Sequence, residues 1–414
     1  MGIADSRRGL RTPALWCAAL AVLTACGSAA APGPPPATRP AFGTLVSLVE
    51  HAREEADAGV SAGMVELSWR RAQPDAEAFD DAYLRSVRRD VEALRVAGRT
   101  VTLGLGLHDV PRWLLAIPGS RFVDQTGAES DEVNLVFDQR LRNIAEHYLT
   151  HVAAVLDLGQ VDAVRLTSGG LPEVLYPGGG GYWAFDANAQ GGPDRPASLP
   201  PNPLPGWRPG QGGVSEQQVR EWADWYVGAL TDVVDWQIGT LSGLGYRGAY
   251  EVLTPGVGVG PAAYDAAIRQ GLPPGLLGSG AAWQVFYERL PRRDDLVAYV
   301  SSVADGSGDN DGCAPGDAAV PLDAAQAESW SATRWVSRVA HEYGFPVAGE
   351  NPGWNQSVRL NASYVDLSDN GMLAAAVRQA DSCGFRFFYW AHDQQLWDGT
   401  VPFAAYAERI ARGS

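Results

Sequence analysis

The stretch GMVELSWRRAQPDAEAFDDAYLRSVRRDVEALRVAGRTVTLGLGL, residues 63–107, indicates the fold class. It begins and ends with short apolar runs, 63–69 and 100–107, which are typical of buried strands. Between these runs, residues 80–96 carry apolar side chains at helical spacing, namely Tyr83, Leu84, Val87, Val91 and Leu94. A strand, a helix and a second strand in this order predict a parallel β–α–β unit.

The same alternation continues over the rest of the chain. Further strands are predicted at 42–48, 161–168, 247–253, 296–304, 345–350 and 385–391. Further helices are predicted at 49–58, 141–156, 219–241, 262–270, 329–343, 372–380 and 403–412. Eight strand–helix units in series predict a single-domain (β/α)₈ TIM barrel over residues 42–414. An open doubly wound sheet is the alternative, but its usual glycine-rich phosphate loop has only a weak match here, Gly104-Leu105-Gly106.

The N-terminus has the pattern of a lipoprotein export signal. Three arginines precede an apolar run, residues 14–25, that is too short to span a membrane. The run ends in Leu23-Thr24-Ala25-Cys26, which resembles a lipobox and predicts lipidation of Cys26. Residues 1–25 are therefore expected to be a signal peptide and residues 26–41 a Pro/Ala-rich tether. The expected location is extracytoplasmic, either lipid-anchored to the cell membrane or secreted.

Two cysteines remain in the predicted barrel, Cys313 and Cys383. An oxidising compartment allows them to form a disulfide. The barrel layout places Cys313 in a loop at the carboxyl ends of the strands and Cys383 at the opposite end. A disulfide needs Cα atoms within about 7 Å. The layout therefore favours two separate cysteines.

Composition excludes some partners. The formal net charge of −16 argues against nucleic acid, because phosphates require Lys and Arg. The 14 Trp and 14 Tyr mildly favour carbohydrate, although most of these rings are expected in the core. The sequence has no zinc spacing and no G-x-S-x-G motif, and its acidic loop 305–317 lacks the final Glu of a calcium loop. No metal and no organic cofactor are expected.

Active sites of (β/α)₈ barrels lie at the carboxyl ends of the strands and in the loops that follow. The longest such loop, 169–213, is dense in Gly and Pro and carries four aromatic residues, so a functional role is predicted. Polar or aromatic candidates at these ends are Glu66, Trp69, His108, Asp109, Arg165, Glu173, Glu251, Asp305, Glu350, Asn351, His392 and Asp393.

Two of these carboxyl groups fit glycoside hydrolysis. The reaction needs one carboxylic acid to protonate the leaving oxygen and one carboxylate to activate water or attack the sugar. Glu173 follows the fourth barrel strand and Glu350 ends the seventh, so their side chains can converge across the mouth. We therefore predict that Glu173 and Glu350 are the catalytic pair.

Several motifs resemble those of β-amylases, glycoside hydrolase family 14. Residues 168–177, SGGLPEVLYP, resemble the motif around the general acid, and residues 347–351, VAGEN, resemble the motif around the general base. Residues 63–69 resemble the second strand, where an acidic residue at the position of Glu66 holds the sugar. His108 with residues 111–114 resembles the third strand and its P-x-W element. The resemblance implies a TIM-barrel glycosidase with Glu173 as acid, Glu350 as base, and inversion of configuration.

The chain also departs from that family. Only Asp109-Val110 separate His108 from the P-x-W element, where β-amylases have a long loop that closes on substrate. Glu251 occupies the position of the Lys that supports the base, and Leu175 that of an Arg. The front half resembles family 42 β-galactosidases as well, but these end strand four with Asn-Glu, not Thr-Ser. A retaining β-galactosidase and a non-catalytic glycan-binding lipoprotein therefore remain alternatives.

Further residues are expected to bind the carbohydrate substrate. Glu66, His108, Asn351 and His392 are predicted to hydrogen-bond sugar hydroxyls, and the rings of Trp183 and Trp390 are predicted to stack on sugar faces. Arg165 lies either in the barrel interior as a charge partner or in the site. Membrane contact is expected only through the lipid anchor.

Overall fold

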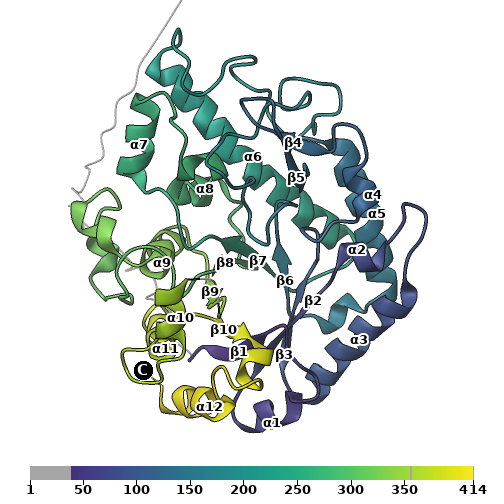
Figure 1. Cartoon of the computed structure of the whole chain (residues 1–414), viewed down its shortest axis with the longest axis vertical. Helices are drawn as coiled ribbons and strands as arrows, with labels where there is room; N and C mark the ends of the chain where they lie inside the picture. The colour runs from purple at the N-terminus through teal and green to yellow at the C-terminus, as the bar shows by residue number, and fades with distance from the viewer. Residues whose placement is uncertain (1–38, 355–356, 414) are drawn as a thin grey trace, which may run out of the picture. The chain divides into compact units, whose positions relative to one another are not determined.

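The computed structural model describes residues 39–354 and 357–413. Eight parallel strands close into a barrel surrounded by helices (Figure 1), which confirms the (β/α)₈ fold. In chain order the strands are β1 (Ala41–Leu45), β2 (Ala62–Glu66), β3 (Thr100–Gly104), β6 (Ala163–Leu166), β7 (Ala249–Thr254), β8 (Leu296–Val300), β9 (Val347–Glu350) and β10 (Phe387–His392). Each pairs with its neighbours along this series, and β10 closes on β1. The expected signal peptide, Cys26 and all but the last residues of the expected tether lie outside the described residues.

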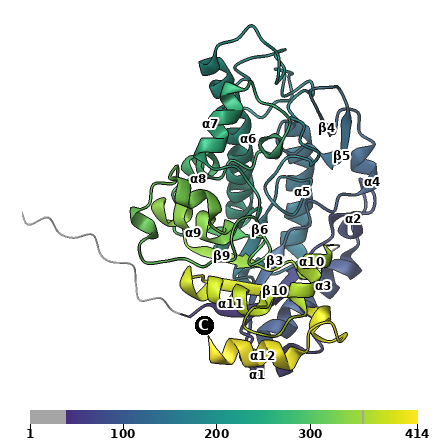
Figure 2. The ribbon, with the colours of Figure 1, turned by 60° about the vertical axis from the view of Figure 1, so that its left-hand side comes forward.

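Each predicted helix is present. They are α1 (Ala52–Asp57), α3 (Asp81–Val96), α5 (Gln139–Val155), α6 (Glu216–Gly243), α7 (Pro261–Arg269), α9 (Ala332–Glu342), α11 (Met372–Ser382) and α12 (Phe403–Arg412). In Figure 2, α11 and α12 lie side by side outside the strands. None of the described helices is long and apolar enough to cross a membrane.

Short elements inside the loops escaped the sequence analysis, since they are too short for a clear period. They are α2 (Trp69–Ala72), α4 (Arg112–Leu115), α8 (Trp283–Arg289), α10 (Val358–Tyr364) and the hairpin of β4 (Arg121–Val123) with β5 (Glu129–Val133).

Helix α3 shows how local sequence sets these boundaries. The side chain of Asp80 accepts a hydrogen bond from the backbone N–H of Tyr83 and caps the first turn. The apolar face predicted from the sequence is buried against the barrel. The helix ends before Gly98, whose φ of 85° lies in the left-handed region that favours glycine.

Alternation along the strands determines which residues face the barrel interior. An inner apolar cluster fills the barrel and contains Leu45, Ala62, Met64, Ala163, Ala249, Leu253, Val297, Tyr299, Ala348 and Tyr389. Four residues each lie two positions after a member of this cluster on the same strand and therefore share its inward direction: Glu66, Arg165, Glu251 and Glu350. The sequence therefore places four ionisable residues next to this apolar cluster, toward the end of the barrel where active sites lie.

The long loop after β6 is packed against α6 by aromatic rings. Tyr176 stacks on Tyr226 with ring centroids 4.0 Å apart, and Tyr226 stacks on Trp222 at 5.1 Å. The hydroxyl of Tyr176 also donates to the carbonyl oxygen of Tyr226 at 2.8 Å. These rings are fully buried. The loop that carries Glu173 is thereby anchored on a long helix.

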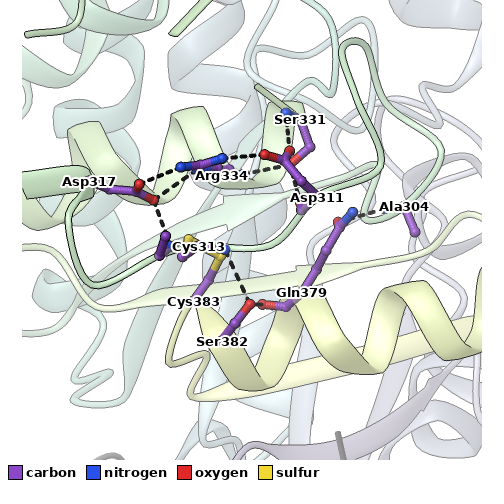
Figure 3. The surroundings of a disulfide bond; sticks show 10 residues. Ala304, Asp311, Cys313, Asp317, Ser331, Arg334, Gln379, Ser382 and Cys383 are labelled. Carbon is purple, nitrogen blue, oxygen red and sulfur yellow. Dashed lines mark hydrogen bonds and ion pairs between the residues drawn. A yellow bond between two sulfur atoms is a disulfide. The ribbon is translucent and has the colours of Figure 1, made fainter. Parts of the chain in front are cut away.

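The expectation that Cys313 and Cys383 stay apart is wrong, because they form a disulfide with Cα atoms 4.9 Å apart. The loop after β8 turns outward and follows the last turn of α11 (Figure 3). The backbone N–H of Ala304 donates to Gln379 Oε1 at 3.0 Å, and that of Cys313 to Ser382 Oγ at 3.2 Å. The sequence analysis placed this loop at the carboxyl ends of the strands. In the structure the loop is long enough to reach the C-terminal end of α11.

The acidic residues of the same loop bind an arginine. Asp311 and Asp317 both form ion pairs with Arg334 of α9 (Figure 3). Ser331, which caps α9, also donates its hydroxyl to the carbonyl oxygen of Asp311 at 2.7 Å. The loop is therefore held at both α9 and α11.

Removing the disulfide is expected to lower stability. The bond closes a sequence separation of 70 residues, and cross-links of this kind stabilise proteins by roughly 2–4 kcal/mol. Urea unfolding of the wild type should show a lower midpoint after reduction with dithiothreitol. The variant with both Cys313→Ser and Cys383→Ser should have that lower midpoint already and not respond to the reductant. Equal midpoints for oxidised and reduced wild type would contradict this expectation.

Candidate active site

Glu350 is the last residue of β9, and its side chain points inward at the carboxyl end of the barrel. It is only 8% exposed. Its Oε2 accepts hydrogen bonds from Arg165 Nη2 and from the hydroxyl of Tyr299, each at 2.7 Å. Two donors on one oxygen, one of them cationic, stabilise the ionised carboxylate. Oε1 has no hydrogen-bond partner among the described residues and is left for a reacting group.

Glu173 lies in the loop after β6 and faces the same end of the barrel. Its Oε1 accepts a hydrogen bond from Ser301 Oγ at 3.1 Å. Ser301 stands two residues beyond Tyr299, so one short chain segment donates a hydrogen bond to each of the two glutamates. Burial raises the pKa of Glu173 above its usual value, and the negative charge of Glu350 raises it further. Glu173 therefore retains its proton at higher pH than an exposed glutamate.

The loop is fixed immediately around Glu173. The backbone N–H of Val174 donates to the carbonyl oxygen of Leu253 on β7 at 3.0 Å. The backbone N–H of Leu175 donates to Ser168 Oγ at 2.9 Å. The segment that carries Glu173 is therefore attached to strand β7 and to the start of its own loop.

Other carboxyl groups surround this pair. Burial raises the pKa of Glu66 to about 7, that of Glu251 to about 8 and that of Asp305 to about 7. The charge of Glu350 contributes to all three raised pKa values, whereas Arg165 partly offsets those of Glu66 and Glu251. Glu350 lies closer to the guanidinium of Arg165, at 2.7 Å, than Glu66 does, at 4.0 Å.

Glu66 and His108 lie where the sequence placed them, beside Arg165. Glu66 Oε2 is 4.0 Å from Arg165 Nη1. His108, half-buried in the loop after β3, has its pKa lowered by burial and by the charge of Arg165. A neutral imidazole next to a carboxyl group can donate and accept hydrogen bonds. Sugar binding by these two residues stays a prediction.

Two predicted substrate-binding residues are structural instead. Asn351 is fully buried, and its side chain donates to the carbonyl oxygen of Val303 at 2.7 Å and accepts from the N–H of Gly353 at 3.0 Å. Trp390 is also fully buried and stacks on Tyr364 of α10, with ring centroids 4.9 Å apart. Trp390 faces the helices because its neighbour Tyr389 faces the barrel interior. The expected sugar contacts of both residues are therefore wrong.

The remaining predicted contacts are partly accessible. His392 is exposed at the carboxyl end of β10. Trp183 is half-buried, and its backbone N–H donates to the hydroxyl of Tyr226 on α6 at 3.0 Å. Their roles in sugar binding stay predictions.

The sequence analysis missed two polar residues and one ring. Tyr299 and Ser301 line the segment beside Glu350, where alternation from Val297 would have placed Tyr299 inward. Trp354, four residues after Glu350, is 50% exposed. Its backbone N–H donates to Gln395 Oε1 in the loop after β10 at 3.0 Å. The sequence contained a signal for this residue. Trp354 follows a Pro-Gly pair shortly after a strand-end glutamate, a place where a ring can remain exposed.

Within the described ranges, no three or more His, Cys, Asp or Glu side chains are placed to hold a metal ion.

No protein-family model and no curated protein sequence matches the chain. Solved structures do match over most of its length. A β-galactosidase from Bacillus circulans sp. alkalophilus is 12% identical over 85% of this chain and 50% of that chain, with a TM-score of 0.50. A β-galactosidase from the psychrophilic Marinomonas ef1 is 13% identical over 85% and 54%, with a TM-score of 0.51. This chain thus spans about half the length of these two proteins.

A GH5-4 broad specificity endoglucanase from an uncultured bacterium is 15% identical over 89% of this chain and 85% of that chain, with a TM-score of 0.45. At such identities a structural likeness shows the fold alone. The fold of the two β-galactosidase structures agrees with the barrel, and the resemblance to β-amylases stays a prediction.

Proposed function

We propose that this protein hydrolyses O-glycosidic bonds, with Glu173 as general acid and Glu350 as general base. The observation that carries the proposal is the pairing of two different carboxyl groups at the barrel mouth. Glu350 accepts hydrogen bonds from Arg165 and Tyr299, while the pKa of Glu173 is raised by burial and by Glu350. This reaction requires one carboxyl group that keeps its proton and one carboxylate that can accept a proton.

The proposed reaction uses each group once. Glu173 transfers its proton to the leaving oxygen as the bond from the anomeric carbon to that oxygen breaks. Glu350 takes a proton from a water molecule whose oxygen bonds to the anomeric carbon from the opposite face. The guanidinium of Arg165 pairs with the Glu350 carboxylate at 2.7 Å and positions it. The indole of Trp354 offers an accessible face at the rim for an apolar sugar face.

A screen of aryl glycosides and oligosaccharides tests the activity itself. Release of reducing sugar by the wild type supports the proposal. Saturable glycan binding in calorimetry, with no turnover at high protein concentration, would instead favour the glycan-binding alternative.

We also propose that the reaction inverts the anomeric configuration. This part rests on the β-amylase-like motifs and on the position of Glu173, which lies in a loop and not at the strand tip. Inverting pairs stand roughly 6.5–9.5 Å apart to leave room for water, whereas retaining pairs stand roughly 5–5.5 Å apart. Proton NMR of the first product, read before mutarotation, should show the anomer opposite to the substrate's. A product with the substrate's configuration would make Glu350 a nucleophile and favour the β-galactosidase-like alternative.

We further propose that the protein is exported and lipid-anchored through Cys26. The lipobox-like residues Leu23 to Cys26 support this location. Mass spectrometry of the N-terminal peptide from cells should find lipid on the wild type and on the control Cys17→Ala, but not on Cys26→Ala. Lipid on the Cys26→Ala variant would refute the assignment.

A further inference from the structure

Two carboxyl groups are buried side by side where the first strand of the barrel meets the last one. Glu55 belongs to α1, and Asp393 begins the 3₁₀ turn η5 (Asp393–Leu396), which directly follows β10. Both residues are 0% exposed. The indole N–H of Trp397 donates to both carboxyl groups, at 3.2 Å to Glu55 Oε1 and at 3.1 Å to Asp393 Oδ1. Because one N–H reaches an oxygen of each, the two carboxyl groups are immediate neighbours.

A single arginine pairs with these two acids. The guanidinium of Arg99, which is only 2% exposed, forms an ion pair with Glu55 and donates to the hydroxyl of Thr44 at 2.9 Å. The backbone N–H of Leu48, an uncharged donor, reaches Asp393 Oδ2 at 2.6 Å. If both acids were ionised beside this one cation, a negative charge would remain uncompensated in the interior, which costs several kcal/mol.

A proton held between the two acids removes this cost. The pKa of Glu55 is raised to about 8, mainly by burial, with contributions from the hydrogen bond and the charge of Asp393. The charge of Arg99 and the hydrogen bond from Trp397 partly offset the shift. A protonated Glu55 can donate to a carboxylate at Asp393, which leaves one net negative charge for Arg99 to balance.

Two other ionisable side chains lie on the elements packed around the pair. The ring of His51, just before α1, stacks on that of Trp397 with centroids 3.7 Å apart. Tyr406 of α12 donates its hydroxyl to the carbonyl oxygen of Gly43 at 2.7 Å. Burial raises the pKa of Tyr406 well above its usual value, so this residue stays neutral. His51 is therefore the group that an experiment has to separate from Glu55.

The turn η5 also holds the rim of the candidate active site. Gln395 lies two residues after Asp393, and its Oε1 accepts from the backbone N–H of Trp354 at 3.0 Å. The same oxygen accepts from the hydroxyl of Tyr364 on α10 at 2.7 Å. Trp354 follows Glu350 by four residues. A displacement of η5 would therefore release the segment that continues from the candidate base.

We propose that Glu55 and Asp393 share one proton and form a pH-dependent latch, which holds η5 in place and, through Gln395, the segment after Glu350. Loss of the proton leaves two carboxylates beside Arg99, and their repulsion favours an opened η5. The inference does not depend on the hydrolase function, because it concerns the seam of the barrel and not the reaction.

The direction of the pH dependence follows from the proton balance. The closed state keeps a proton up to a pKa of about 8, whereas an opened, hydrated Glu55 releases it near its usual value of 4.5. The latch is therefore strongest below the lower value and weakens as the pH rises toward the upper one. Between the two, release of one proton on opening makes the ratio of open to closed molecules rise about tenfold per pH unit.

Hydrogen exchange of the full-length protein, followed by mass spectrometry, tests the latch. Rates are divided by the intrinsic exchange rate at each pH. In the wild type, protection of the amides of residues 393–401 should fall roughly tenfold per pH unit between about pH 6 and pH 7.5 and level off above about pH 8. Glu55→Gln, which resembles the protonated glutamate in shape, should show no such slope.

Matched variants identify the titrating group. Glu54→Gln removes a charge from an exposed position of the same helix, and His51→Phe keeps the stacked ring without its titration, so both should keep the wild-type slope. Asp393→Asn should level off at a lower pH, because Asp393 no longer raises the pKa of Glu55. A flat wild-type profile, a wild-type slope in Glu55→Gln, a lost slope in His51→Phe or an unchanged levelling point in Asp393→Asn would each overturn the shared proton.

The link to the rim has its own test in the same experiment. In the wild type, amides of α10 should lose protection over the same pH range as residues 393–401. Gln395→Leu removes the acceptor that joins the two segments. In this variant residues 393–401 should keep their slope, while exchange of α10 should no longer follow it. Exchange of α10 that is independent of pH in the wild type would overturn the link between the latch and the segment after Glu350.

Discussion

Replacing Glu350 with Gln is expected to lower kcat by about 10⁴-fold, the upper end of what general acid–base catalysis contributes. The amide keeps the size of the carboxyl group but cannot take a proton from water. It also leaves the guanidinium of Arg165 without its nearest anion, which lies at 2.7 Å in the wild type. Initial rates on the best substrate of the glycoside screen measure the loss.

Glu251→Gln is the matched control for this experiment. Glu251 is fully buried in the same barrel, near the same Arg165, and burial raises its pKa to about 8. Its carboxyl group is therefore largely neutral at pH 7, so an isosteric amide should change the rate little. Circular dichroism and thermal melts establish that both variants fold. A folded Glu350→Gln variant with nearly wild-type kcat would refute the assigned role.

The change Glu173→Gln is expected to lower the rate roughly 10²- to 10⁴-fold on oligosaccharides, whose leaving groups need a proton. An aryl glycoside with an activated leaving group should lose far less, because its departure requires little protonation. Comparing kcat/KM on both substrates measures the difference. Equal losses on the two substrates would contradict the role of general acid.

The pH dependence provides a second test of Glu173. Burial and the charge of Glu350 raise its pKa, so the folded protein holds this proton at higher pH than an unfolded chain does. Activity that needs the protonated form is full below the raised pKa and falls as the pH rises through it. The wild type should therefore lose activity on the alkaline side, and Glu173→Gln should lose that limb of the profile. An unchanged alkaline limb in the variant would assign it to another group.

The barrel was predictable because its signals are local. Apolar runs and helical periods occur within single segments such as 80–96, and eight strand–helix units in series favour the closed parallel sheet over an open one. The carboxyl ends of the strands then indicate where to find Glu66, Arg165 and Glu350, whose inward direction follows from alternation with small apolar neighbours.

The errors arise where the answer depends on contacts between distant segments. Strand β10 has adjacent aromatic residues, so the sequence does not tell which of Tyr389 and Trp390 faces inward. The role of Asn351 depends on the carbonyl oxygen of Val303, which a separate loop brings to it. The disulfide depends on the outward path of that same loop, since helix and strand periods say nothing about where a loop runs.

Chemical rescue of Glu350→Ala tests the central claim most directly. The substitution removes the carboxylate but keeps Arg165 and Tyr299, whose donors can hold a small anion in its place. We expect a folded, nearly inactive variant whose turnover of the best aryl glycoside rises with sodium formate until it saturates, while sodium chloride at equal ionic strength has no effect. A folded Glu350→Ala variant that binds substrate but does not respond to formate, or one that is fully active without it, would contradict a catalytic role for the Glu350 carboxylate.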